Sequence, residues 1–118
     1  LPDAQAAARL KARFGAVTFG ETRSTDRDVG YTLDKRAVRV CVRENGALQP
    51  RDTTLLVLLH ELAHIMTKSE GHTAEFRRNM RALVQAARDL GVLQAFPATY
   101  HCGERVRLDA SSSFLLFG

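Results

Sequence analysis

The hydrophobic positions of this 118-residue chain first follow a helical repeat and then short strand-like alternations. Near the start, apolar residues recur at helical spacing, which predicts an amphipathic helix over residues 3–14 that ends before Gly15. Its apolar stripe consists of Ala7, Leu10 and Phe14. We expect this helix to pack on the core and to carry no chemistry.

Three short segments after this helix have the character of strands. Residues 16–19 and 30–33 are the first two, and Asp34-Lys35 is a tight turn after the second. Residues 37–43 give the clearest pattern, because valines alternate there with polar residues. Such alternation predicts one buried and one solvent-facing side.

Two longer helical patterns occupy the second half of the chain. After a loop over residues 44–50, the most apolar run of the sequence predicts a helix with Asp52 or Thr53 as its N-cap and an end near Thr67 or Lys68. A third helix is predicted over residues 74–90. Its N-cap would be Thr73 and its stop Gly91, and its apolar residues at helical spacing are expected in the core.

The last part of the chain is less regular. Residues 96–103 are expected to form a loop around Pro97, and residues 105–108 a last strand. The apolar segment 114–117 is too short to cross a membrane and is expected to pack on the core or to end the chain.

This order of elements predicts an α+β fold with an N-terminal helix, a three-stranded sheet and two longer helices. We expect a single domain over residues 1–118, with 110–118 as a tail. The hydrophobic share of 45% and the charged share of 25% are ordinary for a globular protein. No apolar run reaches 18 residues, so no membrane span is predicted. A soluble protein of the cytoplasm or nucleus is the favoured interpretation, and the oligomeric state is left open.

The chain has two cysteines, Cys41 and Cys102. Two are too few for a disulfide framework, so we expect two free thiols in a reducing compartment, with a single bridge as the alternative. For Cys102, a buried small residue and a thiol near a metal are both open interpretations.

The most specific signal is His60-Glu61-Leu62-Ala63-His64, the H-E-x-x-H pattern of zinc peptidases. Two histidines at i and i+4 lie one turn apart on one helix face, where both imidazoles can bind one Zn²⁺. Glu61 is then placed to act as a general base on water rather than as a ligand. The alternative, a chance match on a polar helix surface, does not suit so hydrophobic a segment.

A catalytic zinc ion usually takes three protein ligands. We predict His72 as the third, because Gly71 lets the chain turn back toward the metal. Glu75 is the second candidate and His101 the third. Tyr100 is predicted as a catalytic donor to an oxyanion, with Tyr31 as its rival and a surface tyrosine as the alternative interpretation.

The motif together with Gly71-His72 and Glu75-Phe76 resembles minimal zincin metallopeptidases of the WLM and SprT-like (Spartan) type. It is also similar to short predicted metallopeptidases of large DNA viruses and algae. The resemblance covers about Leu55 to Leu90, a third of the chain. It implies a small zincin-like domain and hydrolysis of peptide bonds, with a protein or peptide substrate. It also implies an edge strand that takes extended substrate, either 29–33 or 38–42.

Seventeen Lys and Arg against thirteen acidic residues give a net charge of +4. This permits weak, non-specific binding of DNA, and the resemblance implies action on DNA-associated proteins. A solvated basic surface is the alternative for these arginines, which include Arg9, Arg13, Arg77 and Arg81. As other functions, we consider a non-catalytic metal- or nucleic-acid-binding module and a non-proteolytic hydrolase on the same scaffold.

Overall fold

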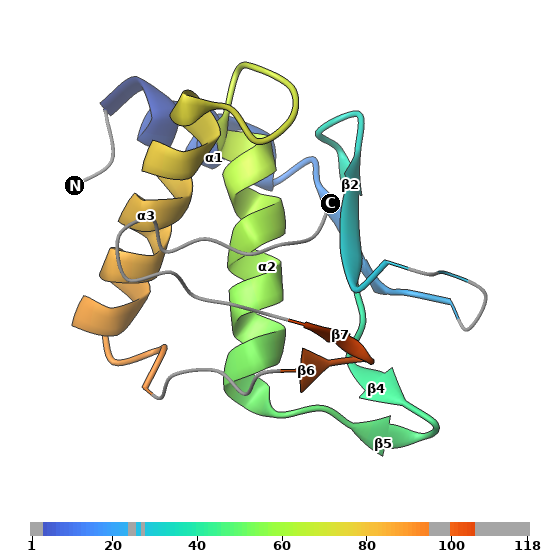
Figure 1. Cartoon of the computed structure of the whole chain (residues 1–118). Helices are drawn as coiled ribbons and strands as arrows, with labels where there is room; N and C mark the ends of the chain where they lie inside the picture. Colours follow the sequence, from blue (N-terminus) through green and yellow to red (C-terminus); the bar gives the residue numbers. More distant parts are fainter. Residues whose placement is uncertain (1–3, 24–25, 27, 95–99, 106–118) are drawn as a thin grey trace.

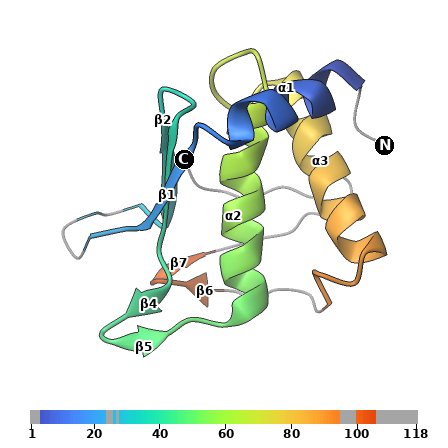
Figure 2. The ribbon, with the colours of Figure 1, turned by 180° about the vertical axis from the view of Figure 1, so that it is seen from behind.

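The computed structural model describes residues 4–23, 26, 28–94 and 100–105. Three helices and a small three-stranded sheet form a mixed α+β fold, as predicted. Figure 1 shows α2 (Arg51–Met66) between α3 (Ala74–Asp89) and the sheet. In the view from behind, α1 (Ala4–Phe14) crosses the end of α2 that leads into α3 (Figure 2). The α2 helix therefore touches every layer of the fold.

The sheet consists of β1 (Thr18–Glu21), β2 (Gly30–Leu33) and β3 (Ala37–Val40) in the order β1-β3-β2. The central strand β3 runs parallel to β1 and antiparallel to β2. Of the two predicted candidates for an edge strand, 29–33 contains the edge strand β2, and 38–42 is wrong because β3 is paired on both sides. Pairing of this edge with a substrate stays a prediction. Asp34 and Lys35 have φ values of 52° and 53°, and they form the predicted tight turn between β2 and β3.

Two hydrophobic clusters cover opposite sides of α2. The first lies between α2 and α3 and includes Leu56, Ala63, Phe76 and Met80. The second lies between α2 and the sheet and contains Val57, Ile65 and the buried valines of the sheet layer, which are Val17, Val29, Val38 and Val40. The alternation predicted for residues 37–43 is confirmed for the first part, since Arg39 is exposed between two buried valines. The strand ends at Val40, earlier than predicted, and Val42 is only partly buried. Apolar side chains therefore cover both of these faces of α2.

The ends of the helices agree only in part with the predictions. The predicted cap Thr73 is confirmed, because its hydroxyl accepts a hydrogen bond from the Phe76 backbone N–H at 3.2 Å. The prediction of Asp52 or Thr53 as the N-cap of α2 was wrong, since Pro50 occupies that position without a side-chain cap. The Thr53 hydroxyl donates instead to the Pro50 carbonyl, and Asp52 accepts from the backbone N–H of Gln94.

Two small hairpins lie near the N-terminal end of α2 (Figure 1). Residues 44–50, predicted as a loop, contribute to the pair β4 (Arg43–Glu44) and β5 (Ala47–Leu48), because Asn45-Gly46 forms a turn with both φ values positive. The second hairpin pairs β6 (Tyr100–His101) with β7 (Glu104–Arg105). The predicted loop 96–103 is therefore partly a strand.

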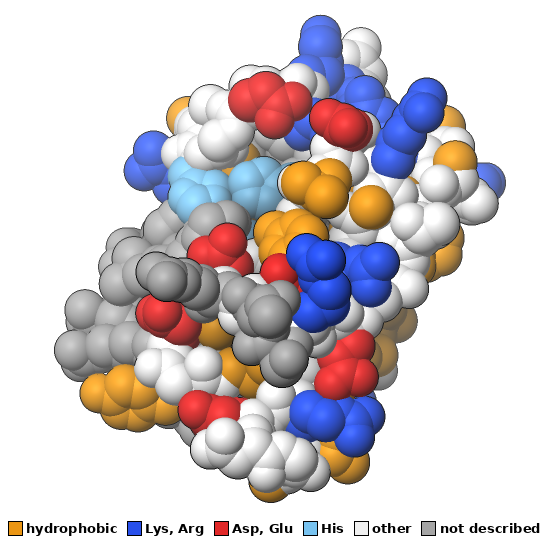
Figure 3. Space-filling view, turned by 90° about the vertical axis from the view of Figure 1, so that its right-hand side faces the viewer, with side chains coloured by type: hydrophobic (Ala, Val, Ile, Leu, Met, Phe, Trp, Pro, Cys, Tyr) orange, Lys and Arg blue, Asp and Glu red, His pale blue; other side chains and the backbone are white. Residues whose placement is uncertain are grey.

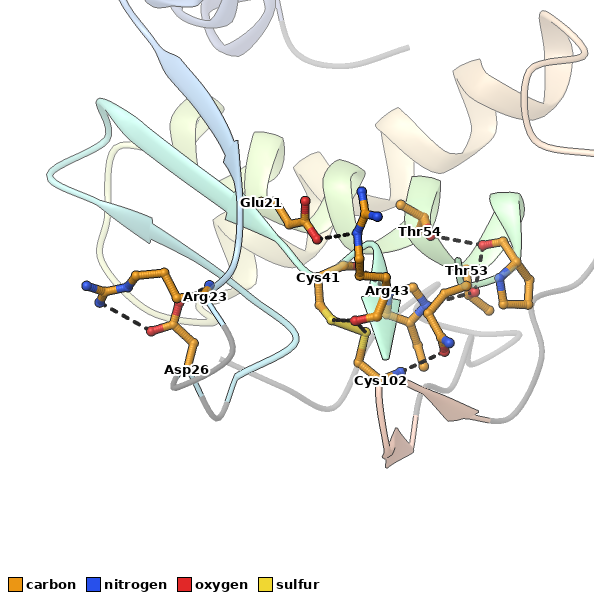
Figure 4. Close-up of a disulfide and its surroundings, with 11 residues drawn as sticks. Glu21, Arg23, Asp26, Cys41, Arg43, Thr53, Thr54 and Cys102 are labelled. Carbon is orange, nitrogen blue, oxygen red and sulfur yellow. Dashed lines mark hydrogen bonds and ion pairs between the residues drawn. A yellow bond between two sulfur atoms is a disulfide. The ribbon is translucent and has the colours of Figure 1, made fainter. Parts of the chain in front are cut away.

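A disulfide joins Cys41 to Cys102, so the expectation of two free thiols was wrong (Figure 4). The two cysteines meet because polar groups hold the second hairpin against the segment after β3. Gln49 accepts the backbone N–H of Cys102 at 3.0 Å, and the His101 ring lies 2.6 Å from the Cys41 carbonyl. Because Cys102 forms this disulfide, its interpretation as a thiol near a metal is excluded.

Three cations hold the C-terminal end of α2. Lys35, Arg13 and Arg9 donate to the successive carbonyls of His64, Ile65 and Met66, at 2.6, 2.7 and 2.8 Å. The last carbonyls of a helix lack the usual i+4 N–H donor, and positive charge is favourable at a helix C-terminus. Of the three, the His64 carbonyl also accepts the backbone N–H of the C-cap Thr67, at 3.3 Å. Arg9 and Arg13 are therefore structural, which differs from the predicted solvated or DNA-binding surface.

The predicted segments 114–117 and 110–118 lie outside the described residues, as does most of the predicted strand 105–108. Within the described ranges, no helix has both the length and the apolar character that a membrane span requires.

Candidate metal centre

Three histidines come together where α2 turns toward α3. His60 and His64 lie one turn apart on α2, and His72 lies in the segment that connects α2 with α3. One nitrogen from each ring is within 4.8 Å of the other two, so the group could hold a metal ion. Gly71 has a φ of 80°, a conformation that favours glycine, and this turn directs the following residue back toward α2. The structure thus assembles the three predicted ligands.

The Phe76 ring packs against all three histidines. Its centroid is 5.0 Å from that of His60, 4.3 Å from that of His64 and 4.9 Å from that of His72. Phe76 is fully buried in the first turn of α3. Its ring therefore restricts the rotamers of the three imidazoles and shields one side of the group from water.

The group is buried on one side and open on the other. His60 is 0% exposed, whereas His64 and His72 are partly exposed. Figure 3 shows pale-blue histidine atoms at the surface of this side of the molecule. An ion held by the three rings would accordingly be accessible from this face.

Glu61 is fully buried between α2 and the sheet. Its Oε1 atom accepts a hydrogen bond from the Thr32 hydroxyl of β2 at 2.9 Å. Among the described residues, its Oε2 atom has no hydrogen-bond partner. Burial raises the pKa of the Glu61 carboxyl to about 8; the hydrogen bond from Thr32 opposes this rise, and the charge of Asp28 adds to it. A buried carboxylate with an unsatisfied oxygen is costly unless water or an ion completes it.

A cleft of about 180 Å³ runs between β2 and the segment that carries His72. Its walls are formed by residues from both sides, namely Tyr31, Thr32, Asp34, Lys35, Glu61, His64, Glu70 and Gly71. The outer edge of β2 is unpaired in the described sheet, and it borders the cleft beside Glu61 and His64. The cleft therefore brings together an open strand edge, an acid and a candidate metal ligand.

The other predicted ligands lie elsewhere. Glu75 accepts the backbone N–H groups of Lys68 and Ser69, at 2.9 and 3.1 Å, and does not belong to the histidine group. His101 is buried beside Thr53, at 2.9 Å, near the other end of α2. Thr53 precedes His60 by seven residues, a rise of about 10 Å along a helix. These positions favour His72 over both alternatives.

Tyr100 is 61% exposed and lies in β6, next to His101. It does not line the cleft of Glu61, whereas its rival Tyr31 does. The Tyr31 hydroxyl donates to Asp26 at 3.3 Å. Tyr31, rather than Tyr100, is thus the phenol that the fold brings near the histidines.

Sequence reasoning missed Thr32 and Gly30. Thr32 binds Glu61, and a Cβ atom at Gly30 would lie 3.2 Å from Glu61 Oε2 and 2.8 Å from a methyl group of Val57. Both residues are ordinary members of a strand, and no local motif signals their contact with a helix about thirty residues later. The contact becomes evident only in the folded structure, where β2 lies against α2.

The chain is similar to uncharacterized proteins of viruses. It is 31% identical over 71 residues to the uncharacterized protein 042R of Invertebrate iridescent virus 3, which covers 58% of this chain and 45% of that protein. It is 30% identical over 99 residues to the uncharacterized protein R325 of Acanthamoeba polyphaga mimivirus, which covers 77% of this chain and 50% of that protein. The chain thus spans half or less of the length of these relatives. No protein-family model and no solved structure matches it.

Proposed function

We propose that this chain is a zinc-dependent peptidase. The observation that carries the proposal is the position of Glu61, a buried acid that follows His60 on α2 and shares a cleft with His64, but is not itself a member of the histidine group. A purely structural metal site has no need of such an acid, whereas hydrolysis needs a base beside the metal.

The donor set fits zinc. Three neutral imidazoles with a free fourth position are typical of catalytic zinc sites, and His60, His64 and His72 would hold the ion. When bound, zinc supplies a Lewis acid that lowers the pKa of water and polarises a carbonyl group. Imidazole also suits copper, iron and nickel, so metal analysis is part of the test.

The residues of the chain have distinct tasks in this reaction. Thr32 holds one oxygen of Glu61, which leaves the other to take a proton from the attacking water and to pass it to the leaving amine. The open edge of β2 is suited to pair with an extended peptide, and Tyr31 lies along the same cleft. A peptide held there would have its backbone beside Glu61 and His64.

The experiment compares the parent with Glu61→Gln and His72→Ala. Zinc content is measured by mass spectrometry, and turnover with a fluorogenic casein substrate. Glu61→Gln should keep one zinc ion per chain and lose turnover by about 10²–10⁴-fold, since it retains the shape but not the basicity. His72→Ala should lose zinc. Stoichiometric zinc without turnover in the parent would instead favour the non-catalytic metal-binding module.

A further inference from the structure

The third histidine lies in the short segment 67–73, and the path of this segment decides whether His72 meets the other two. Its start is fixed by Thr67, whose hydroxyl donates to the Ala63 carbonyl at 2.6 Å and accepts from Asn79 at 2.9 Å. Its end is fixed by Thr73, the N-cap of α3. The residues between these two anchors have no regular secondary structure to hold them.

Glu75, in the first turn of α3, holds the residues that lie between these two anchors. Its carboxylate accepts the backbone N–H of Lys68 at 2.9 Å, and from Ser69 both the backbone N–H at 3.1 Å and the hydroxyl at 2.9 Å. The N–H of Lys68 is the main reason why the pKa of Glu75 is lowered to about 2, and both donors of Ser69 add to it. The carboxylate is therefore ionised at neutral pH and accepts all three bonds.

Other elements hold the same segment by its carbonyl groups. Lys35 donates to the Ser69 carbonyl at 3.3 Å, and Arg77 donates to the His72 carbonyl at 3.2 Å. Arg9 lies 3.9 Å from Glu75 and also caps α2. Glu75 thus contacts both this segment and Arg9 of α1, and Arg77 adds a second contact from α3.

We propose that Glu75 is a positioning residue, which holds segment 67–73 so that His72 stays within reach of the metal bound by His60 and His64. This inference rests on the metal site of the proposed function. Without Glu75, the N–H groups of Lys68 and Ser69 and the Ser69 hydroxyl would bind water instead. Metal binding would then have to fix the position of His72 at a cost in conformational entropy. Partners that orient a metal ligand typically change metal affinity by about 10–100-fold when removed.

Zinc affinity tests the proposal without any assay of turnover. The parent, Glu75→Ala, His72→Ala and the double variant are titrated with zinc against a chromophoric chelator, and thermal unfolding without metal is measured alongside. Glu75→Ala should bind zinc about 10–100-fold more weakly than the parent. The double variant should bind as weakly as His72→Ala alone, because Glu75 acts only through His72.

Asp89→Asn is the matched control. It removes one negative charge from an exposed residue at the far end of α3, outside the cleft of Glu61 and the histidine group, so its zinc affinity should equal that of the parent. If Glu75→Ala does not fold, Ser69→Ala removes one of the three donors and should show a smaller loss that again vanishes in the His72→Ala background.

The outcomes separate this inference from the proposed function. A parent that binds no zinc overturns both. If Glu75→Ala binds zinc as tightly as the parent does, the positioning role alone is overturned. Equal losses from Glu75→Ala with and without His72 also overturn it, since they indicate a general effect on stability.

Discussion

The Thr32 hydroxyl donates a hydrogen bond of 2.9 Å to Oε1 of Glu61, and thereby links the edge strand β2 to the central helix. Thr32→Val keeps the shape and the strand preference but removes this donor. A typical hydrogen bond contributes about 0.5–1.5 kcal/mol, so turnover should fall by about twofold to tenfold. Zinc affinity should stay unchanged, because Thr32 does not belong to the histidine group.

Thr32→Ser is the matched control for this prediction. It keeps the hydroxyl group and should retain most of the turnover of the parent. If Thr32→Val is as active as Thr32→Ser on a peptide substrate, then Glu61 does not depend on β2 for its orientation.

Gly30 allows the sheet to approach α2 closely. A Cβ atom there would lie 2.8 Å from Cγ1 of Val57, 3.1 Å from the Arg39 carbonyl and 3.2 Å from Oε2 of Glu61. Gly30→Ala should therefore lower the free energy of unfolding by about 1–3 kcal/mol, as overpacking of a core does. Gly15→Ala is the control, since its Cβ would meet nothing within 4 Å. Equal urea midpoints for the two variants would contradict this close approach.

The centre of the site was predictable, because it depends on local spacing. His60 and His64 meet through the repeat of a helix, and Gly71 marks the turn that returns His72. Thr73 as the N-cap of α3 follows from the same kind of short-range rule.

The supporting contacts were not predictable, because they join segments that are far apart in sequence. Cys41 and Cys102 are separated by 61 positions, and their thiols carry no local sign of a partner. Arg9 and Arg13 resemble solvated charges on an amphipathic helix until α1 is seen to cross the end of α2 (Figure 2). The N-cap of α2 was predicted wrongly because the Asp52 carboxylate accepts a hydrogen bond from the backbone N–H of Gln94, which follows α3 in the chain.

The disulfide should make a large contribution to stability. In the chain-entropy model, a link between residues 61 positions apart stabilises the fold by about 4 kcal/mol, because it restricts the unfolded chain. Cys102→Ser should lower the free energy of unfolding by about 2–4 kcal/mol and leave zinc affinity nearly unchanged, since the hairpin lies near the other end of α2. The measurement is urea unfolding of the parent with and without a reductant. A parent whose midpoint ignores the reductant would contradict the bridge.

His101 should make the fold sensitive to mild acid. Its Nε2 atom lies 2.6 Å from the Cys41 carbonyl, which can only accept, so this nitrogen is the donor and Nδ1 faces the Thr53 hydroxyl. Burial lowers the pKa of His101, although the Cys41 carbonyl and the charge of Glu44 oppose this shift. The unfolded chain then takes up the proton more readily, so stability should fall as the pH drops below about 6.5.

Urea unfolding at pH 7.5 and 5.5 measures this effect, with a chelator present so that metal binding does not contribute. His101→Gln keeps polar atoms at this position but does not titrate, so its stability should fall less over the same pH range than that of the parent. An identical loss in both proteins would assign the acid sensitivity to other groups.

Arg13 should matter for stability and not for nucleic acid. Its guanidinium donates to the Ile65 carbonyl at 2.7 Å, in the middle of the three carbonyls that basic residues cap at the end of α2. Arg13→Ala should lower the free energy of unfolding by about 1–2 kcal/mol, as expected for the loss of a charged partner at a helix C-terminus. Lys11→Ala removes the same charge from an exposed position of α1 and should have little effect.

DNA binding by arginine variants separates the two interpretations of the net positive charge, which are a DNA-binding surface and a solvated surface. The arginines of α3 are all exposed and could meet phosphate groups, namely Arg77, Arg78, Arg81 and Arg88. Fluorescence anisotropy with DNA at low salt should give weak binding that ignores sequence and disappears at physiological ionic strength. The double variant Arg78→Ala/Arg81→Ala should reduce it, while Arg13→Ala should bind DNA like the parent wherever it is folded. If Arg13→Ala loses DNA binding without losing stability, its guanidinium faces phosphate in solution rather than the end of α2.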